Sequence, residues 1–140
     1  MSMHIETFTD LLQIACSQPL PQRLLFVFAG AELPEHSTPQ EQADFAAGRG
    51  GALAPLMCVD KDPRELASFA ALASEASQFG QDWVLVFTAA LSGSVGLPPS
   101  EALIDQQLQA MTAAVRRGEF EAWLAFDRDG LPVQLGRDDA

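Results

Sequence analysis

Two long apolar runs constrain the fold of this chain more than any other feature of its sequence. Residues 24–29 read LLFVFA, and residues 83–91 read WVLVFTAAL. Neither run alternates between apolar and polar side chains, so both faces of each segment should be covered. The aromatic and β-branched content of the second run favours strand over helix. We therefore predict two central strands of one sheet, with helices on both of its faces.

The segments around these runs alternate between helix and strand patterns. Helical spacing appears within residues 4–17, after the Thr38-Pro39 start signal, within 62–79, and along Ile104, Leu108, Met111 and Val115. Strand patterns cover residues 52–59, 120–126 and 131–135. Pro55 marks the first of these strands as an edge strand or as locally irregular, and Pro132 marks the last as an edge strand. This alternation predicts an α/β class. We expect a single domain over residues 1–140, with 137–140 as a loose tail. Its mixed, mostly parallel sheet has four to five strands, helices packed on its faces and a C-terminal β-hairpin. The strand order does not follow from the sequence.

Charge limits the partners that we expect for this chain. Its 140 residues include 19 acidic and 8 basic side chains, for a net charge of -11. Such a surface repels nucleic-acid phosphates and anionic lipid headgroups, so neither nucleic acid nor membrane is an expected partner. No apolar stretch is long enough to span a bilayer, and the first ten residues do not resemble a secretory signal. These patterns predict a cytoplasmic protein.

The residues that commonly bind metals are few and scattered. Cys16 and Cys58 lie in apolar patterns without a C-x-x-C pair, so we expect both to be small buried side chains. His4 and His36 have no partner at ligand spacing, which predicts no metal site and no cofactor. A Ser-His-Asp arrangement of His36 with a serine of the 92–96 loop is formally possible, but no G-x-S-x-G elbow supports it.

Candidate site residues follow from the predicted parallel sheet, because ligands bind at the carboxyl ends of its strands. Those ends are residues 30–32, 60–62 and 92–96. Asp60 could act as a general base tuned by Lys61, although a capping role for Asp62 with the other two on the surface is the favoured interpretation. Ser92 and Ser94 are further catalytic candidates.

The 92–96 loop also contains small residues that could let main-chain N–H groups approach a phosphate, with Gly93 and Gly96 as ligand-binding candidates. However, Pro98 and Pro99 remove two N–H donors nearby, and Glu101 adds a negative charge. A connecting loop is therefore the favoured interpretation.

Three segments carry a resemblance to a known family: residues 22–34 (QRLLFVFAGAELP), 50–63 (GGALAPLMCVDKDP) and 126–136 (FDRDGLPVQLG). Together they resemble small proteobacterial proteins of unknown function that often carry the label "ribonucleotide reductase subunit alpha". The resemblance covers nearly the whole chain and brings no catalytic residues with it. A catalytic subunit of that enzyme needs several active-site cysteines and relay tyrosines, whereas this chain has two cysteines and no tyrosine.

Three hypotheses about function follow. The first is a non-catalytic binding or protein-interaction module, with a homo-oligomer as one form of it, because the chain has material for a core but no convergent titratable groups. The short edge strands could serve as its pairing surface, although proline usually blocks such pairing. The second is a small hydrolase or transferase with a site near Asp60 and Ser92. The third, an accessory protein of nucleotide metabolism, is implied by the resemblance alone.

Overall fold

Strand β1 (Gln22–Glu32) is the centre of a five-stranded sheet in the computed structural model, which describes residues 7–32, 38–46, 52–80, 82–119 and 123–133. The order of the strands across the sheet is β2-β1-β3-β4-β5. The other strands are β2 (Ala52–Lys61), β3 (Leu85–Ser92), β4 (Leu124–Asp127) and β5 (Pro132–Val133). Each neighbouring pair is antiparallel.

The prediction of a mostly parallel sheet is therefore wrong. Strands β2 and β3 do run in the same direction, but β1 lies between them and runs the opposite way. The apolar runs predicted two covered faces, a property that is typical of parallel sheets. Here an antiparallel sheet has helices on both faces, so the same apolar pattern arises without parallel neighbours.

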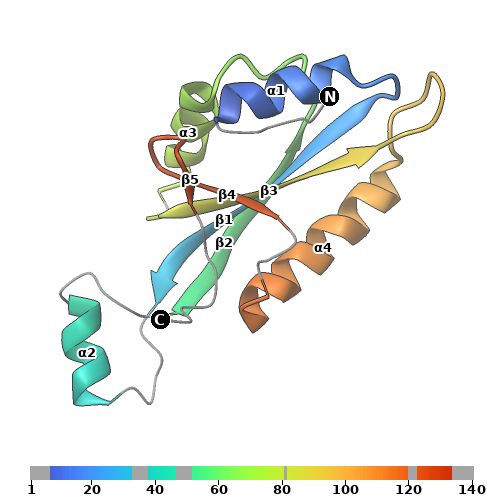
Figure 1. Ribbon diagram of the computed structural model, residues 1–140. Helices are drawn as coiled ribbons and strands as arrows, with labels where there is room; N and C mark the ends of the chain where they lie inside the picture. The colour runs from blue at the N-terminus through green and yellow to red at the C-terminus, as the bar shows by residue number, and fades with distance from the viewer. Residues whose placement is uncertain (1–6, 33–37, 47–51, 81, 120–122, 134–140) are drawn as a thin grey trace.

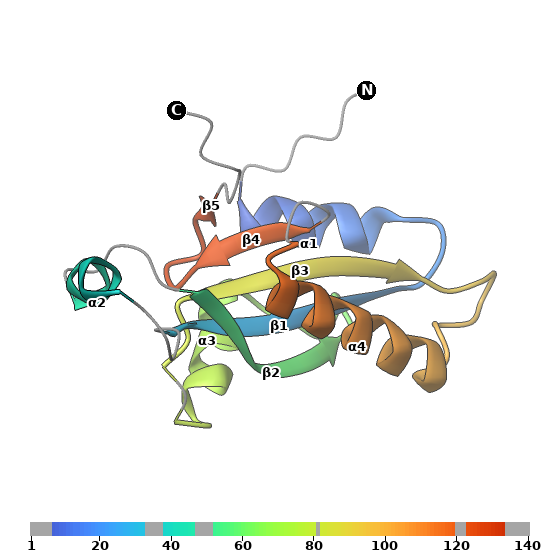
Figure 2. The same cartoon turned by 90° about the horizontal axis from the view of Figure 1, so that it is seen from below.

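The helices divide between the two faces of the sheet, as the apolar runs predict. Helices α1 (Phe8–Ser17) and α3 (Phe69–Ser77) cover one face, and α4 (Glu101–Arg117) covers the other (Figure 1). Alternate side chains of β1 enter the two cores, Leu24, Phe26 and Phe28 on the α1 and α3 side and Leu25, Val27 and Ala29 on the α4 side. Helix α2 (Pro39–Ala46) links β1 to β2 and lies beyond the strand ends (Figure 2).

Aromatic side chains dominate the core on the α1 and α3 side. The ring centroid of Phe8 lies 5.1 Å from that of Phe69 and 5.4 Å from that of Phe126, and both pairs of rings meet edge to face. Trp83 packs at 5.0 Å against Phe28 in the same geometry. Such pairs contribute about 0.5–1.5 kcal/mol beyond the area that they bury. On the other side, the predicted stripe of α4 is buried against the sheet and consists of Ile104, Leu108, Met111 and Val115.

The helix starts follow their capping residues. Thr38 and Glu41 exchange main-chain to side-chain hydrogen bonds of 3.0 and 3.1 Å and so form a capping box at the predicted start of α2. Helix α3 begins later than predicted, after its N-cap Ser68, because the Asp62 carboxylate instead accepts from the Arg64 N–H in a turn. The predicted strand from Trp83 begins at Leu85, and parts of the predicted segments 4–17, 120–126 and 131–135 lie outside the described residues.

The turn between β4 and β5 gives a stability test. Gly130 has a φ of +82°, and a Cβ atom there would lie 2.9 Å from Phe69 Cδ2 within the aromatic core. Gly118 has a similar φ of +75° with no atom within 4 Å of such a Cβ. Gly118→Ala should cost about 1–2 kcal/mol through its left-handed backbone alone. Gly130→Ala should cost about 1–3 kcal/mol more, through the contact with Phe69.

Urea unfolding of both variants measures this difference. An equal loss of unfolding free energy in the two variants would show that the Gly130 turn does not press on Phe69.

Candidate functional site

Strand β2 forms one margin of the sheet and is far longer than the strand at the other margin. It spans ten residues, whereas β5 has two and contains Pro132. Pro55 was expected to mark an edge strand or a local irregularity, and it lies on an edge strand beside a register shift. Pro132 lies on the other edge strand, as predicted. Residues 52–59 carry no charge, and Asp60 and Lys61 follow them. A long uncharged edge strand offers main-chain groups for pairing with another chain.

A bulge divides β2 into two parts. Phe28 pairs with Met57, and the next residue of β1, Ala29, pairs with Pro55, so Leu56 is an extra residue. Leu56 packs against Gly30, where a Cβ atom would lie only 2.9 Å from Leu56 Cδ1. The absent side chain at position 30 thus makes room for the bulge.

The direction of the main-chain groups in β2 follows from β1. The Ala29 and Pro21 carbonyls each accept a 2.8 Å hydrogen bond from the β3 side. Main-chain groups of a strand alternate in direction, so the even-numbered residues of β1 turn toward β2. Their partners Met57, Val59 and Lys61 therefore bond to β1, while Cys58 and Asp60 direct their N–H and C=O groups out of the sheet.

Pro55 occupies a third outward position, because its partner Ala29 turns toward β3. Proline has no N–H, so it removes a donor from this margin without weakening the pairing with β1. The free donors of the described edge after the bulge are therefore the amides of Cys58 and Asp60.

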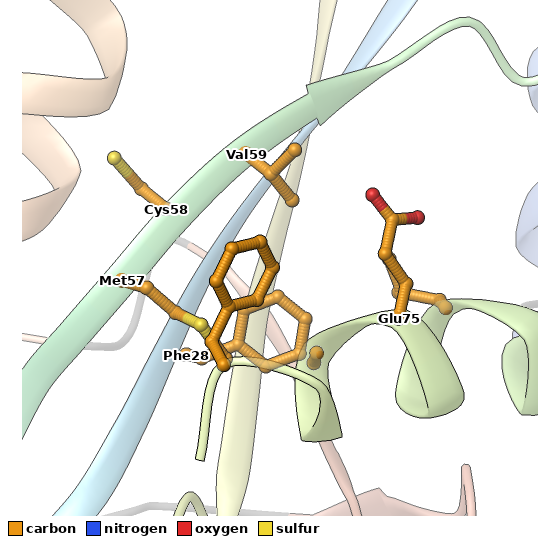
Figure 3. Close-up of a pocket in the computed structure, with 8 residues that line it drawn as sticks. Phe28, Met57, Cys58, Val59 and Glu75 are labelled. Atoms are coloured by element: carbon orange, nitrogen blue, oxygen red, sulfur yellow. The ribbon is translucent and has the colours of Figure 1, made fainter. Parts of the chain in front are cut away.

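An apolar groove lies on one side of β2, between the strand and α3. We call it the α3 groove; it has a volume of about 160 Å³ and is lined by Phe28, Met57, Cys58, Val59, Leu72, Glu75, Ala76 and Phe79. The Phe79 side chain is 67% exposed at its rim. In Figure 3, Met57 and Val59 lie on the side of β2 that faces Glu75, and Cys58 points away from them. The Glu75 carboxylate accepts from Lys61 Nζ at 2.7 Å.

A second groove lies on the opposite side of β2, against α4. This α4 groove has a volume of about 480 Å³ and is lined by Cys58, Asp105, Leu108, Gln109, Thr112, Ala113 and Arg116. Partial burial, together with the carboxylates of Asp105 and Asp60, raises the pKa of the Cys58 thiol. Asp105 makes no ion pair with any residue that the structure describes. The open edge of β2 is thus flanked by a groove on each face.

The proposed general base and its tuner do not act together in this geometry. Asp60 and Lys61 are consecutive residues of a strand, so their side chains point to opposite faces. Asp60 Oδ2 accepts from Arg23 Nε at 2.6 Å on the α4 side, while Lys61 bonds to Glu75 on the α3 side. Each candidate is held by its own ion pair.

The 92–96 loop lies at the same end of the sheet as Asp60, with β1 between them. Two strand spacings separate the ends of β2 and β3 by about 10 Å. Ser92 Oγ accepts from Gln22 Nε2 at 2.8 Å. The main-chain N–H groups of Gly93, Ser94 and Leu97 all donate to carbonyls of Pro21, Leu97 and Ser94. A phosphate cradle would need free N–H groups, so these bonds favour a structured turn, with Gly96 at a φ of +74°.

A third pocket of about 200 Å³ lies at this end of the sheet, and the residues that line it include Cys16, Gln22, Arg64 and Gly96. The Arg64 guanidinium could attract an anion there, but it already bonds to the Asp62 carboxylate at 3.2 and 3.3 Å. These bonds lower the pKa of Asp62 and raise that of Arg64, so the pair is fully ionised and internally neutral. With its guanidinium already paired, this pocket is a poorer candidate for a binding site than the edge of β2.

The cysteine prediction is wrong for both residues. Cys16 and Cys58 are free and exposed, because each lies at the border of its apolar pattern: one at the end of α1 and the other on the edge strand. His4 and His36 lie outside the described residues. Within the described part of the chain, no three His, Cys, Asp or Glu side chains gather as metal ligands would. None of the described helices has the length and apolarity to cross a membrane.

Comparisons with known proteins give no family for this chain. No protein-family model matches it, and searches of curated proteins and of solved structures found no match. The resemblance to the small proteobacterial family stays a prediction.

Amide exchange tests the assignment of the outward groups. We expect the amide protons of Cys58 and Asp60 to exchange with deuterium at least about tenfold faster than those of Met57, Val59 and Lys61, which bond to β1. Residue-resolved exchange by NMR measures this alternation. Uniform protection from position 57 to 61 in the monomer would contradict it.

Thiol reactivity tests the electrostatics of the α4 groove. The thiolate is the nucleophile, so a raised pKa should make Cys58 slow to alkylate near pH 8 and faster as the pH rises further. In a Cys16→Ser background, Asp105→Asn removes a negative charge and should accelerate alkylation at pH 8. Asp129→Asn makes the same change of charge in the turn between β4 and β5 and should leave the rate unchanged. Equal rates for all three proteins would refute the contribution of Asp105.

Proposed function

We propose that this protein is a non-catalytic interaction module of the bacterial cytoplasm that binds an extended segment of a partner along the open edge of β2. Its two outward main-chain pairs of donor and acceptor, at Cys58 and Asp60, supply the hydrogen bonds of an added strand. The α3 and α4 grooves receive alternate side chains of the added segment. The observation that carries this proposal is the combination of a long edge strand with a groove on each of its faces.

The bulge and Pro55 restrict where a segment can pair. Before the bulge, proline lacks the donor that a continuous ladder needs. After the bulge, residues 57–61 keep an uninterrupted alternation of inward and outward groups. A partner strand therefore pairs with this second part of β2, and the first part resists unlimited edge-to-edge association.

The hydrolase or transferase hypothesis has less support. The Asp60, Lys61 and Ser92 side chains are each engaged by a different neighbour, namely Arg23, Glu75 and Gln22. An active site needs a nucleophile, a base and an orienting group within reach of each other. The exposed free thiols of Cys16 and Cys58 suit a reducing compartment, which supports the cytoplasmic part of the proposal.

Selection of extended peptides from a random library tests this function. We expect selected peptides to slow amide exchange at Cys58 and Asp60, because those amides gain partners only when a strand is added. Cys58→Pro replaces an outward N–H and should abolish binding, whereas Cys58→Ser keeps the amide and should retain it. Pro55→Ala restores a donor at the margin and should strengthen binding or leave it unchanged. Calorimetric titration measures each affinity.

Circular dichroism supplies the folding control for these variants. Cys58→Pro should retain the native spectrum, since the position 58 amide does not bond to β1. Val59→Pro removes an amide that does bond to β1, and the unpaired carbonyl of β1 should lower the stability by about 1–3 kcal/mol. Peptides that bind Cys58→Pro as tightly as the wild type, or that leave the Cys58 and Asp60 amides unprotected, would overturn the proposed function.

A further inference from the structure

We infer that the segment received by the β2 edge alternates apolar and basic side chains and belongs to a different protein rather than to a second copy of this chain. This inference rests on the proposed function, and it specifies the chemistry of the partner. It is carried by the contrast between the two grooves and by the charges that border each of them.

The register of the added strand decides which side chain meets which groove. A partner residue opposite Cys58 forms a hydrogen-bonded pair with it, and its side chain points to the same face as Cys58. That face is the α4 side, where Asp105 lies close enough to raise the pKa of the thiol. Partner residues opposite Met57 and Val59 point to the α3 side.

Charge at the α4 groove favours a basic side chain opposite Cys58. The Asp105 carboxylate has no ion pair within the described chain, whereas the other carboxylate that acts on Cys58, that of Asp60, is paired with Arg23. Most described basic side chains are engaged, in the pairs Arg23–Asp60, Lys61–Glu75, Arg64–Asp62 and Arg117–Glu119 and in the Arg128 contact with the Trp83 ring. Arg116 also lines the α4 groove, but it follows Asp105 by eleven residues, or about 16 Å along α4, so it does not pair with that carboxylate. A lysine or arginine of the partner would neutralise Asp105 and lower the electrostatic cost of binding to a chain with net charge -11.

The α3 groove favours apolar side chains in the alternate positions. Its walls are apolar apart from Glu75 at the rim, and the exposed ring of Phe79 extends the apolar surface outward. Covering this ring and the Met57 and Val59 side chains removes apolar area from water, which contributes about 25 cal/mol per Å². The added segment therefore needs the alternation of apolar and basic residues that a strand provides.

A second copy fits the same edge less well. The two-fold antiparallel register that uses both outward residues places Val59 opposite Val59 of the second copy, and Cys58 opposite Asp60 of the second copy. That arrangement brings no free basic side chain to Asp105, because Asp60 of the second copy is accompanied only by the Arg23 with which it is already paired. It also adds repulsion between two chains of net charge -11. Like charges at an interface oppose association, so a partner of opposite charge is favoured.

A short blocked peptide that alternates valine and lysine tests this inference on the full chain. It should bind with slowed amide exchange at Cys58 and Asp60, and its affinity should fall as salt rises. Asp105→Asn should weaken binding by about two- to fivefold, as expected for an exposed ion pair. Asp129→Asn makes the same change of net charge at the opposite margin of the sheet and should leave the affinity unchanged within about 1.5-fold.

Two control peptides separate the inference from the function on which it rests. A valine and glutamate peptide that protects Cys58 and Asp60 with equal affinity would overturn the basic partner and leave strand addition intact. A valine and lysine peptide that is N-methylated at the amides facing β2 should not bind. Binding of this methylated peptide at full affinity would overturn strand addition itself. Sedimentation that shows a dimer of the free protein, strengthened by salt and lost in Cys58→Pro, would identify a second copy as the occupant and overturn the inference.

Discussion

The burial of β1 on all sides is the constraint on which the rest of this structure depends. Residues 24–29 are at most 1% exposed, so this run of six apolar side chains meets neither solvent nor an open sheet margin. Each fully buried large apolar side chain contributes about 1.5–3 kcal/mol relative to its exposed state. A strand of this kind needs helices on both faces and a strand on both sides, and the chain meets this need with α1, α3 and α4 and with β2 and β3.

Because β1 needs a strand on both sides, β2 lies at the edge of the sheet. With β3 on one side of β1 and β4 beyond β3, the strand on the other side of β1 has no further strand of the described chain to cover it. The two edge strands differ in length, because β5 has two residues and β2 has ten. Strand β2 is also uncharged over most of its length. Pro55 and the Leu56 bulge limit pairing at one end of β2, and the grooves of α3 and α4 border the other end. These features restrict which segments can pair with the edge of β2.

The sequence predicted which segments are buried far better than how they are connected. The runs around Phe26 and Val86, the α4 stripe and the edge prolines could all be identified, because burial and proline chemistry leave local patterns. Strand direction could not, because covered faces make an antiparallel strand resemble a parallel one. That error placed the candidate site at strand ends, and Cys58 was assigned to the core because the apolar run through it hides the open edge. Its neighbour Pro55 was the one local signal of that edge.

Strand addition at β2 is the central claim, and intermolecular contacts between main chains test it most directly. In a complex of isotope-labelled protein with the unlabelled valine and lysine peptide, nuclear Overhauser effects should connect peptide backbone protons to those of residues 58–60. The lysine side chains should show contacts with α4, and the valine side chains should show contacts with Phe79. Contacts limited to side chains, or located at β5 or α1, would contradict the account.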